Sequence, residues 1–384
     1  MDNMSKRAIV IARRRRQQAR RRRIFAICGA LVAVLVVAGV AFALNSNKTQ
    51  TSENTTESLP VASEQATNSA ATTTTANASN IVMTIKGDKN TLVLKGEEYV
   101  EAGCHAVDTT KQENINDVQV SGTVDTSKTG DYQITYTATD TSGNKATATR
   151  KVSVVDSFDG GTATAIPVCM YHYVYDDTNK PDEVDNNWIE ASLLEQEIAW
   201  TKENNYYYPS YEELRAFVDG KKSLPYKSII FTFDDGKPEF LESGVKLFDK
   251  YEVPATSFVI CCDADAKEKV FSHASQYVEY QSHSYGMHQA GSNVGRGGLI
   301  HACTYDEIKA DQLKAVELLG NSQAYAYPFG DNNDTAHQAL KDAGVLCAFT
   351  IENTMVKVGD DPMALPRVRI NGTYSFETFC AMVS

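Results

Sequence analysis

Metal-binding cysteine pairs are missing from this sequence of 384 residues, although it contains eight cysteines. The adjacent pair Cys261-Cys262 is not a Cys-x-x-Cys motif, and the other cysteines are scattered, so no thiolate metal site is expected. Disulfide bonds are permitted outside the membrane, but the spacing does not reveal their connectivity. Several cysteines fall in expected strands, which predicts buried free thiols.

Basic residues are scarce beyond the amino terminus. Residues 1–23 hold ten Lys and Arg residues against one acid, and without them the formal net charge of −12 becomes about −21. A surface this acidic repels nucleic acid. We therefore expect no nucleic-acid partner for the rest of the chain.

Charge is absent from residues 24–44, a run of 21 mostly apolar residues. As a helix this run is about 31 Å long, which is enough to span one hydrocarbon core. The basic tail at residues 1–23 predicts a cytoplasmic amino terminus, so we expect a single-pass anchor in the cell membrane and an extracellular catalytic domain. A cleaved signal peptide is the alternative, with 41–43 (Ala-Phe-Ala) as a weak cleavage site.

Apolar residues are also scarce in residues 45–79, whose composition predicts a flexible linker. Short alternating runs follow in residues 80–156 and are separated by turn sequences, which predicts a small all-β sandwich. The stretch 121–140 resembles the bacterial immunoglobulin-like modules of surface proteins. We expect this domain to act as a spacer or a weak wall-binding unit.

Strand-like and helix-like segments alternate in the remaining domain, residues 157–384. This alternation predicts an α/β fold built as a distorted barrel, with a doubly wound open sheet as the alternative. In both architectures the chemistry is expected at the carboxyl ends of the strands. The expected strands are 166–170, 228–233, 255–260, 278–281, 324–327, 345–350 and 367–370.

Two adjacent carboxylates, Asp234 and Asp235, end the second of these strands and precede Gly236. On a continuing strand their side chains would point to opposite faces, whereas a bend at the glycine lets both serve one site. Burying both requires a cation or hydrogen-bond donors. The alternative is a solvated turn in which an aspartate caps a helix.

Histidines follow two other expected strands. Side chains five residues apart lie about 140° apart on a helix, so we expect His283 and His288 to reach one ion through a loop that turns at Gly286. Two imidazoles and one carboxylate make a three-ligand divalent metal site with open positions. His172 follows the first strand, and 327–330 (Tyr-Pro-Phe-Gly) ends the fifth with backbone amides available as donors.

With these motifs in place, residues 166–370 resemble the polysaccharide deacetylases, carbohydrate esterase family 4 or the NodB homology family. The motif Thr-Phe-Asp-Asp-Gly stands intact at 232–236, and the resemblance implies Asp234 as general base and Asp235 as metal ligand. The five-residue spacing of His283 and His288 is similar to the branch that deacetylates poly-N-acetylglucosamine. That branch also implies His172, near the start of the domain, as the catalytic histidine.

One departure from the family pattern concerns the orientation of the base. The family has an arginine two residues before the proline of its third motif, where this chain has Ala326. We expect Arg367 or Arg369 to orient Asp234 instead.

The expected reaction is hydrolysis of an acetamide. A divalent ion, zinc first among Zn, Co, Mn and Ni, is expected to activate water, whose proton Asp234 accepts, while His172 protonates the departing nitrogen. The expected metal ligands are Asp235, His283 and His288. The expected oxyanion or substrate residues are Phe329, through its backbone amide, with Tyr327, Pro328 and Arg367.

The expected partner is an N-acetylated glycan, either poly-N-acetylglucosamine, a chitooligosaccharide or peptidoglycan. Two other functions fit parts of the pattern. A non-haem iron oxygenase also uses two histidines and one carboxylate, but it lacks the adjacent second aspartate. A catalytically silent glycan-binding surface protein is the other alternative, because of Ala326 and the β-sandwich.

Overall fold

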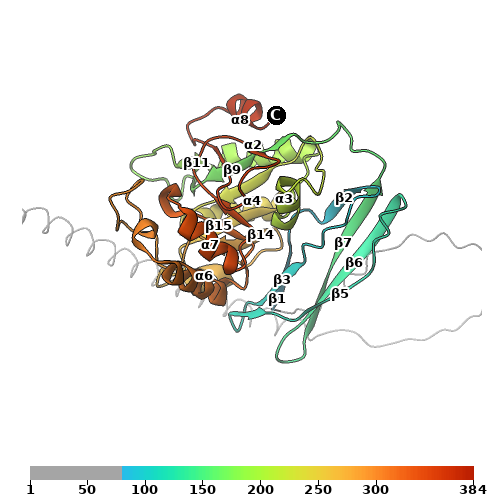
Figure 1. The fold of residues 1–384 in the computed structure, drawn as a ribbon, viewed down its shortest axis with the longest axis horizontal. Coiled ribbons are helices and arrows are strands. Elements are labelled where there is room, and N and C mark those ends of the chain that lie inside the picture. Colours follow the sequence, from blue (N-terminus) through green and yellow to red (C-terminus); the bar gives the residue numbers. More distant parts are fainter. Residues whose placement is uncertain (1–79) are drawn as a thin grey trace, which may run out of the picture. The chain divides into compact units, whose positions relative to one another are not determined.

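The structure is a computed structural model that describes residues 80–384, so the predicted basic tail, membrane span and linker lie outside the described residues. Within 80–384, no helix combines the length and the apolar composition that crossing a membrane requires. The described chain begins with two β-sheets and continues as an α/β domain (Figure 1).

The amino-terminal module has the predicted β-sandwich form. Its two sheets have the strand orders β1-β3-β4 and β2-β7-β6-β5. Side chains from both sheets, including Met83, Tyr136 and Val154, are buried in one apolar cluster, as the alternating pattern predicts. The strands are β1 (Ile81–Ile85), β2 (Asn90–Leu94), β3 (Cys104–Asp108), β4 (Glu113–Ile115), β5 (Val118–Ser121), β6 (Gly130–Thr139) and β7 (Lys145–Val155).

Hydrogen bonds join this module to the α/β domain. The backbone amide of Asp88 donates to the carbonyl of Tyr208 at 2.7 Å, and the Thr84 hydroxyl donates to the carbonyl of Ser275 at 2.6 Å. Arg150 is buried within the module and donates to the carbonyl of Asp88 at 2.9 Å. It thereby holds the residue whose amide contacts Tyr208. The module is therefore attached by specific contacts.

Seven parallel strands form the α/β sheet, at the positions that the sequence predicts. Their order is β16-β15-β14-β13-β12-β9-β18. From β9 to β16 neighbours in space are neighbours in sequence, so the sheet lacks the reversal of strand order that defines a doubly wound fold. The strands are β9 (Val168–Tyr171), β12 (Ile230–Phe233), β13 (Ala255–Val259), β14 (Val278–Ser282), β15 (Ala324–Ala326), β16 (Cys347–Phe349) and β18 (Val368–Arg369).

The segment before β18 partly closes this sheet into a barrel. The backbone amide of Leu365 donates to the carbonyl of Ala348 at 2.8 Å, and the amide of Thr350 donates to the carbonyl of Leu365 at 2.9 Å. These bonds connect the end of β16 to the segment that leads into β18, the two outer strands of the sheet. The result is the distorted barrel expected from the sequence.

Helices accompany the strands through the α/β domain (Figure 1). The longest, α6, begins at a capping box in which the Thr304 hydroxyl accepts from the Glu307 amide and the Glu307 carboxylate accepts from the Thr304 amide. The helices are α2 (Ala191–Glu203), α3 (Tyr211–Val218), α4 (Val245–Tyr251), α5 (Ala266–Ser272), α6 (Tyr305–Leu319), α7 (Asp334–Asp342) and α8 (Phe376–Val383), with a π-helical turn, η1 (Phe240–Gly244), before α4.

Aromatic packing supports the strand that ends at the paired aspartates. Phe233 on β12 stacks on Tyr171 of β9 and on Phe240 of η1, with ring centroids 4.9 and 3.9 Å apart. All three rings are buried, and burial of a side chain of this size stabilises the fold by about 1.5–3 kcal/mol. The end of β12 is therefore held on a rigid base.

Candidate metal centre and active site

A left-handed bend at the end of β12 turns both aspartates into one site. Asp235 has φ 74° and Gly236 has φ 57°. Glycine suits the second position because a Cβ there would come within 3.0 Å of the Val259 backbone. Asp234 and Asp235 are both buried, so the solvated-turn alternative does not hold.

A short loop after β14 brings His283 and His288 to the same place. The left-handed residue of this loop is Ser284, with φ 68°, and the chain also bends at Gly286, where the sequence predicts a turn. The amide of Gly286 and the amide before it both donate at 2.8 Å to the carboxylate of Asp311 on α6. Asp311 therefore anchors the loop between the two histidines.

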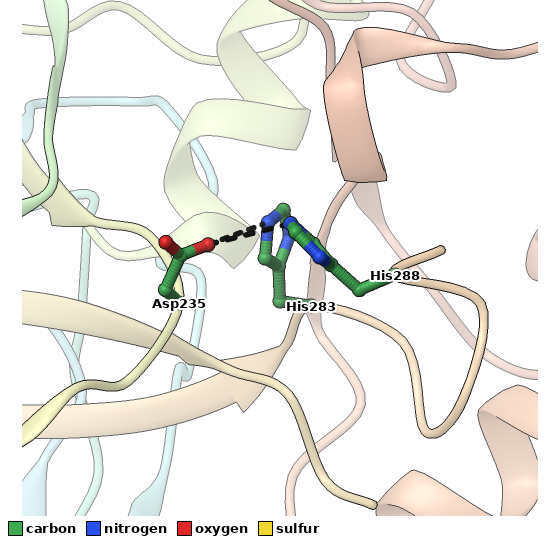
Figure 2. A group of neighbouring side chains, drawn as sticks. All are labelled: Asp235, His283 and His288. Atoms are coloured by element: carbon green, nitrogen blue, oxygen red, sulfur yellow. Dashed lines mark ion pairs between the residues drawn. The ribbon is translucent and has the colours of Figure 1, made fainter. Parts of the chain in front are cut away.

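The two imidazoles converge on one carboxylate oxygen (Figure 2). Nε2 of His283 and Nε2 of His288 lie 3.5 and 3.4 Å from Oδ1 of Asp235. Nδ1 of His283 lies 2.8 Å from the carbonyl oxygen of Ala326 and donates to it, so Nε2 of the neutral ring presents its lone pair to the carboxylate. Two facing lone pairs repel each other, and a proton or a metal cation between them removes this repulsion.

These separations fit a single divalent ion. Two ligand atoms bound at 2.0–2.1 Å with tetrahedral geometry are about 3.4 Å apart. The three candidate ligand atoms all lie within 4.8 Å of one another. Burial opposes a charge on the His283 ring, but the adjacent Asp235 carboxylate holds the pKa of His283 above its usual value, which shows that the surroundings favour positive charge.

The second oxygen of Asp235 has a different partner. Oδ2 accepts a hydrogen bond from the Tyr173 hydroxyl on β10 (Tyr173–Tyr175). The Tyr173 ring rests against Trp188 on β11 (Trp188–Glu190), with centroids 5.0 Å apart. Although burial alone would raise the pKa of Asp235, the neighbouring His283 and the Tyr173 hydrogen bond keep that pKa below its ordinary value. Tyr173 thus leaves Oδ1 free to bind an ion.

The base candidate Asp234 is paired with Arg367. The two guanidinium NH₂ nitrogens of Arg367 donate to the two oxygens of Asp234 at 2.7 Å each, and the arginine is fully buried. Burial alone would raise the pKa of Asp234, but the charge of Arg367 holds it below the ordinary value. Arg369 instead donates to Asn187 at 2.7 Å. Arg367 therefore supplies the contact that Ala326 cannot make, and it fixes the orientation of the Asp234 carboxylate.

His172 lies between β9 and β10, where the negative charges of Asp234 and Asp235 act on its imidazole. Burial lowers the pKa of its imidazole, and Asp234 and Asp235 partly offset this effect. A protonated imidazole with a lowered pKa is a stronger acid, which suits a group that must give a proton to an amine.

Of the other predicted residues, Phe329 reaches the site and Tyr327 does not. Phe329 has φ 60°, and its ring centroid lies 4.7 Å from that of His288. The Tyr327 side chain is buried and its hydroxyl donates to the carbonyl of Met363 at 3.0 Å. Pro328 is buried at the start of η3 (Pro328–Gly330). The side chains of Tyr327 and Pro328 therefore face the core, and a contact of their backbone with the substrate stays a prediction.

Sequence reasoning missed two residues that hold this site in place. These residues are Asp311, which anchors the histidine loop, and Tyr173, which contacts Asp235. No local pattern marks Asp311, since its partners lie 25 and 26 residues away. Tyr171, which precedes His172, is buried and donates to Glu197 at 2.8 Å.

Comparisons with known proteins identify families and relatives that parts of this chain resemble. The polysaccharide deacetylase family model matches residues 221–348, and the family of bacterial surface protein Ig-like domains matches residues 83–154. A Staphylococcus aureus (strain MRSA252) protein named poly-beta-1,6-N-acetyl-D-glucosamine N-deacetylase is 24% identical over 204 residues, which cover 49% of this chain and 70% of that protein.

Two further similarities extend the comparison. An Escherichia coli (strain K12) protein of the same name is 24% identical over 238 residues, covering 51% of this chain and 35% of that protein. Among solved structures, the Streptococcus pyogenes deacetylase PplD in complex with acetate is 21% identical, with a TM-score of 0.49 over 58% of this chain and 100% of that chain.

Proposed function

Because residues 221–348 belong to the polysaccharide deacetylase family, we propose that this polysaccharide deacetylase uses one divalent ion to remove acetyl groups from N-acetylglucosamine units. The observation that carries the proposal is the convergence of His283 and His288 on one oxygen of Asp235, beside the buried pair of Asp234 and Arg367. A metal-dependent acetamide hydrolase needs such a cation site next to an oriented base.

Each residue has a distinct part in this chemistry. A divalent ion held by Asp235, His283 and His288 supplies Lewis acidity toward the acetamide carbonyl and lowers the pKa of water. Asp234, held by Arg367, accepts the proton of the attacking water. The backbone amide of Phe329 donates to the developing oxyanion, a contribution typically worth about 3 kcal/mol. His172 protonates the nitrogen as the C–N bond breaks, so that acetate leaves and the sugar keeps a free amine.

Two relatives carry poly-beta-1,6-N-acetyl-D-glucosamine N-deacetylase as their name, which supports an extended β-linked glucosamine polymer as the substrate. Zinc is the first candidate for the ion, since two imidazoles and a carboxylate suit it. We place the catalytic domain outside the cell on a membrane anchor at residues 24–44, on the ground of the apolar run and the preceding basic tail alone.

The silent glycan-binding alternative loses one of its two supports. It rested on the missing arginine at Ala326 and on the β-sandwich, and Arg367 supplies the first of these from a different part of the chain. The oxygenase alternative does not account for Asp234, a second buried carboxylate that is paired with the Arg367 guanidinium.

The test is acetate release by the purified chain from poly-β-1,6-N-acetylglucosamine oligomers, chitooligosaccharides and peptidoglycan fragments, with and without a chelator. Asp234→Asn should abolish acetate release while the bound metal stays at the level of the unaltered chain. The control is Asp306→Asn, the same change at an exposed residue of α6, which should leave activity unchanged. Full turnover by Asp234→Asn would eliminate Asp234 as the base, and glycan binding without acetate release would support the silent alternative.

A further inference from the structure

The chain beyond His288 folds around one buried carboxylate. Residues 291–298, here called the glycine loop, have the sequence Gly-Ser-Asn-Val-Gly-Arg-Gly-Gly. Asp331 is only 5% exposed, and its two oxygens accept from the Arg296 amide at 2.8 and 3.0 Å and from the Gly298 amide at 2.7 Å. Hydrogen bonds to a carboxylate are among the stronger ones in proteins, so Asp331 defines the path of the glycine loop.

The glycines of this loop are needed because the backbone lies so close to Asp331. A Cβ at Gly295 would lie 2.3 Å from Oδ1 of Asp331, and a Cβ at Gly298 would lie 2.8 Å from Oδ2. Gly295 also has φ 62°, in the left-handed region. The loop sequence and the buried carboxylate therefore fit one another, and the loop has a defined shape.

This shaped loop adjoins the metal centre. A Cβ at Gly298 would lie 3.2 Å from Cδ2 of Phe329, and the Phe329 ring in turn lies against His288. Apolar and polar groups are exposed together here: Phe329 and Val294 are 36% and 59% exposed, and Asn293, which precedes Val294 in the loop, is exposed as well. A pyranose ring, with apolar faces and a rim of hydroxyls, requires such a mixture.

We propose that the glycine loop forms a subsite for the sugar unit next to the one that loses its acetyl group, and that Asp331 is the positioning residue of this subsite. The inference rests on the proposed function, since it takes a polymeric N-acetylglucosamine substrate. Asp331 contacts the loop and no reacting atom. Its loss should therefore weaken the binding of longer substrates more than it slows the chemical step.

The test compares Asp331→Asn with the unaltered chain on N-acetylglucosamine oligomers of one to five units. The amide would turn an N–H group toward loop amides that need an acceptor. We expect KM for the pentamer to rise about tenfold, with kcat changed less than about twofold, bound metal unchanged, and the difference shrinking as the oligomer is shortened. Asp334→Asn, at an exposed residue three positions further on, is the matched control and should behave as the unaltered chain.

Two additional measurements keep the proposal decisive. If Asp331→Asn fails to fold, Gly298→Ala tests the same contact from the loop side. Hydrogen exchange in the chain carrying Asp234→Asn, with and without pentamer, should show added protection at residues 291–298. Unchanged KM values at every length, loss of the bound metal, or no added protection would overturn the subsite. If the unaltered chain releases no acetate, the proposed function fails, and the exchange measurement still decides whether the loop binds the glycan.

Discussion

Replacing Arg367 by methionine should disable the base and change how activity depends on pH. Arg367 is the cation that holds both oxygens of Asp234, at 2.7 Å each, and both residues are buried. Removing one partner of a buried ion pair typically costs about 3–5 kcal/mol, because it leaves an uncompensated charge. Asp234 can avoid this cost by taking up a proton, and a protonated Asp234 cannot act as the base.

The sign of the pH effect follows from the pKa of Asp234. With Arg367 present this pKa lies below its usual value of 3.8, so the base stays ionised throughout the neutral range. Without Arg367 burial raises the pKa, and the base becomes protonated as the pH falls through the new value. General-base catalysis contributes about 10²–10⁴-fold, so we expect kcat/KM of Arg367→Met at pH 6 to fall by about 100-fold and to recover partly at pH 8–9.

The assay is acetate release between pH 5 and 9, with metal content and thermal unfolding measured on the same samples. Arg367→Lys keeps the charge but loses the two-pronged contact, so it should lie between the unaltered chain and Arg367→Met. The matched control is Arg369→Met, since Arg369 contacts Asn187 and not Asp234. An unaltered pH profile in Arg367→Met, or an equal loss in Arg369→Met, would refute the pairing as the source of base orientation.

Two further predictions concern the ligand shell and the fold. Tyr173→Phe removes the donor to Oδ2 of Asp235. Because such supporting contacts typically change metal affinity 10–100-fold, calorimetric titration should show that the variant binds zinc about tenfold more weakly. Equal zinc affinity would contradict this role of Tyr173. Burial raises the pKa of Glu197 to about 8 from 4.5, so the folded state holds a proton that the unfolded state releases, and stability falls as the pH rises from about 4.5 to 8. The slope is about 1.4 kcal/mol per pH unit. In Glu197→Gln the free energy of unfolding, measured with urea at pH 5.5 and 7.5, should depend less on pH. An unchanged slope would show that Glu197 ionises freely.

The strands and the site motifs could be predicted because they depend on local patterns. Buried parallel strands are short apolar runs, and polar side chains directly after such runs must lie at the same edge of the sheet. Asp235, His283 and His288 follow this logic, although they come from segments far apart in the sequence. The bend at Gly236 could also be predicted, because glycine adopts left-handed conformations readily.

The remainder depends on contacts between distant residues, which no local pattern encodes. Arg367 and Arg369 are two positions apart, so strand alternation places both on the same face and cannot distinguish them. Which of the two arginines reaches Asp234 depends on how the segment after β16 closes the barrel. Arg367 lies 133 residues from Asp234 in sequence. Likewise Asp331 lies 33 residues beyond Gly298, and only the folded chain shows that its carboxylate determines the path of the glycine loop.

The central claim is that one ion bound by Asp235, His283 and His288 supports acetamide hydrolysis. The most direct measurement is the metal content of the purified chain, taken together with acetate release from poly-β-1,6-N-acetylglucosamine oligomers before chelation, after chelation and after return of zinc. We expect one ion per chain, loss of turnover as the ion is removed, and recovery in proportion to the zinc rebound, with His288→Ala failing to recover. Undiminished acetate release from the metal-free chain would contradict the account.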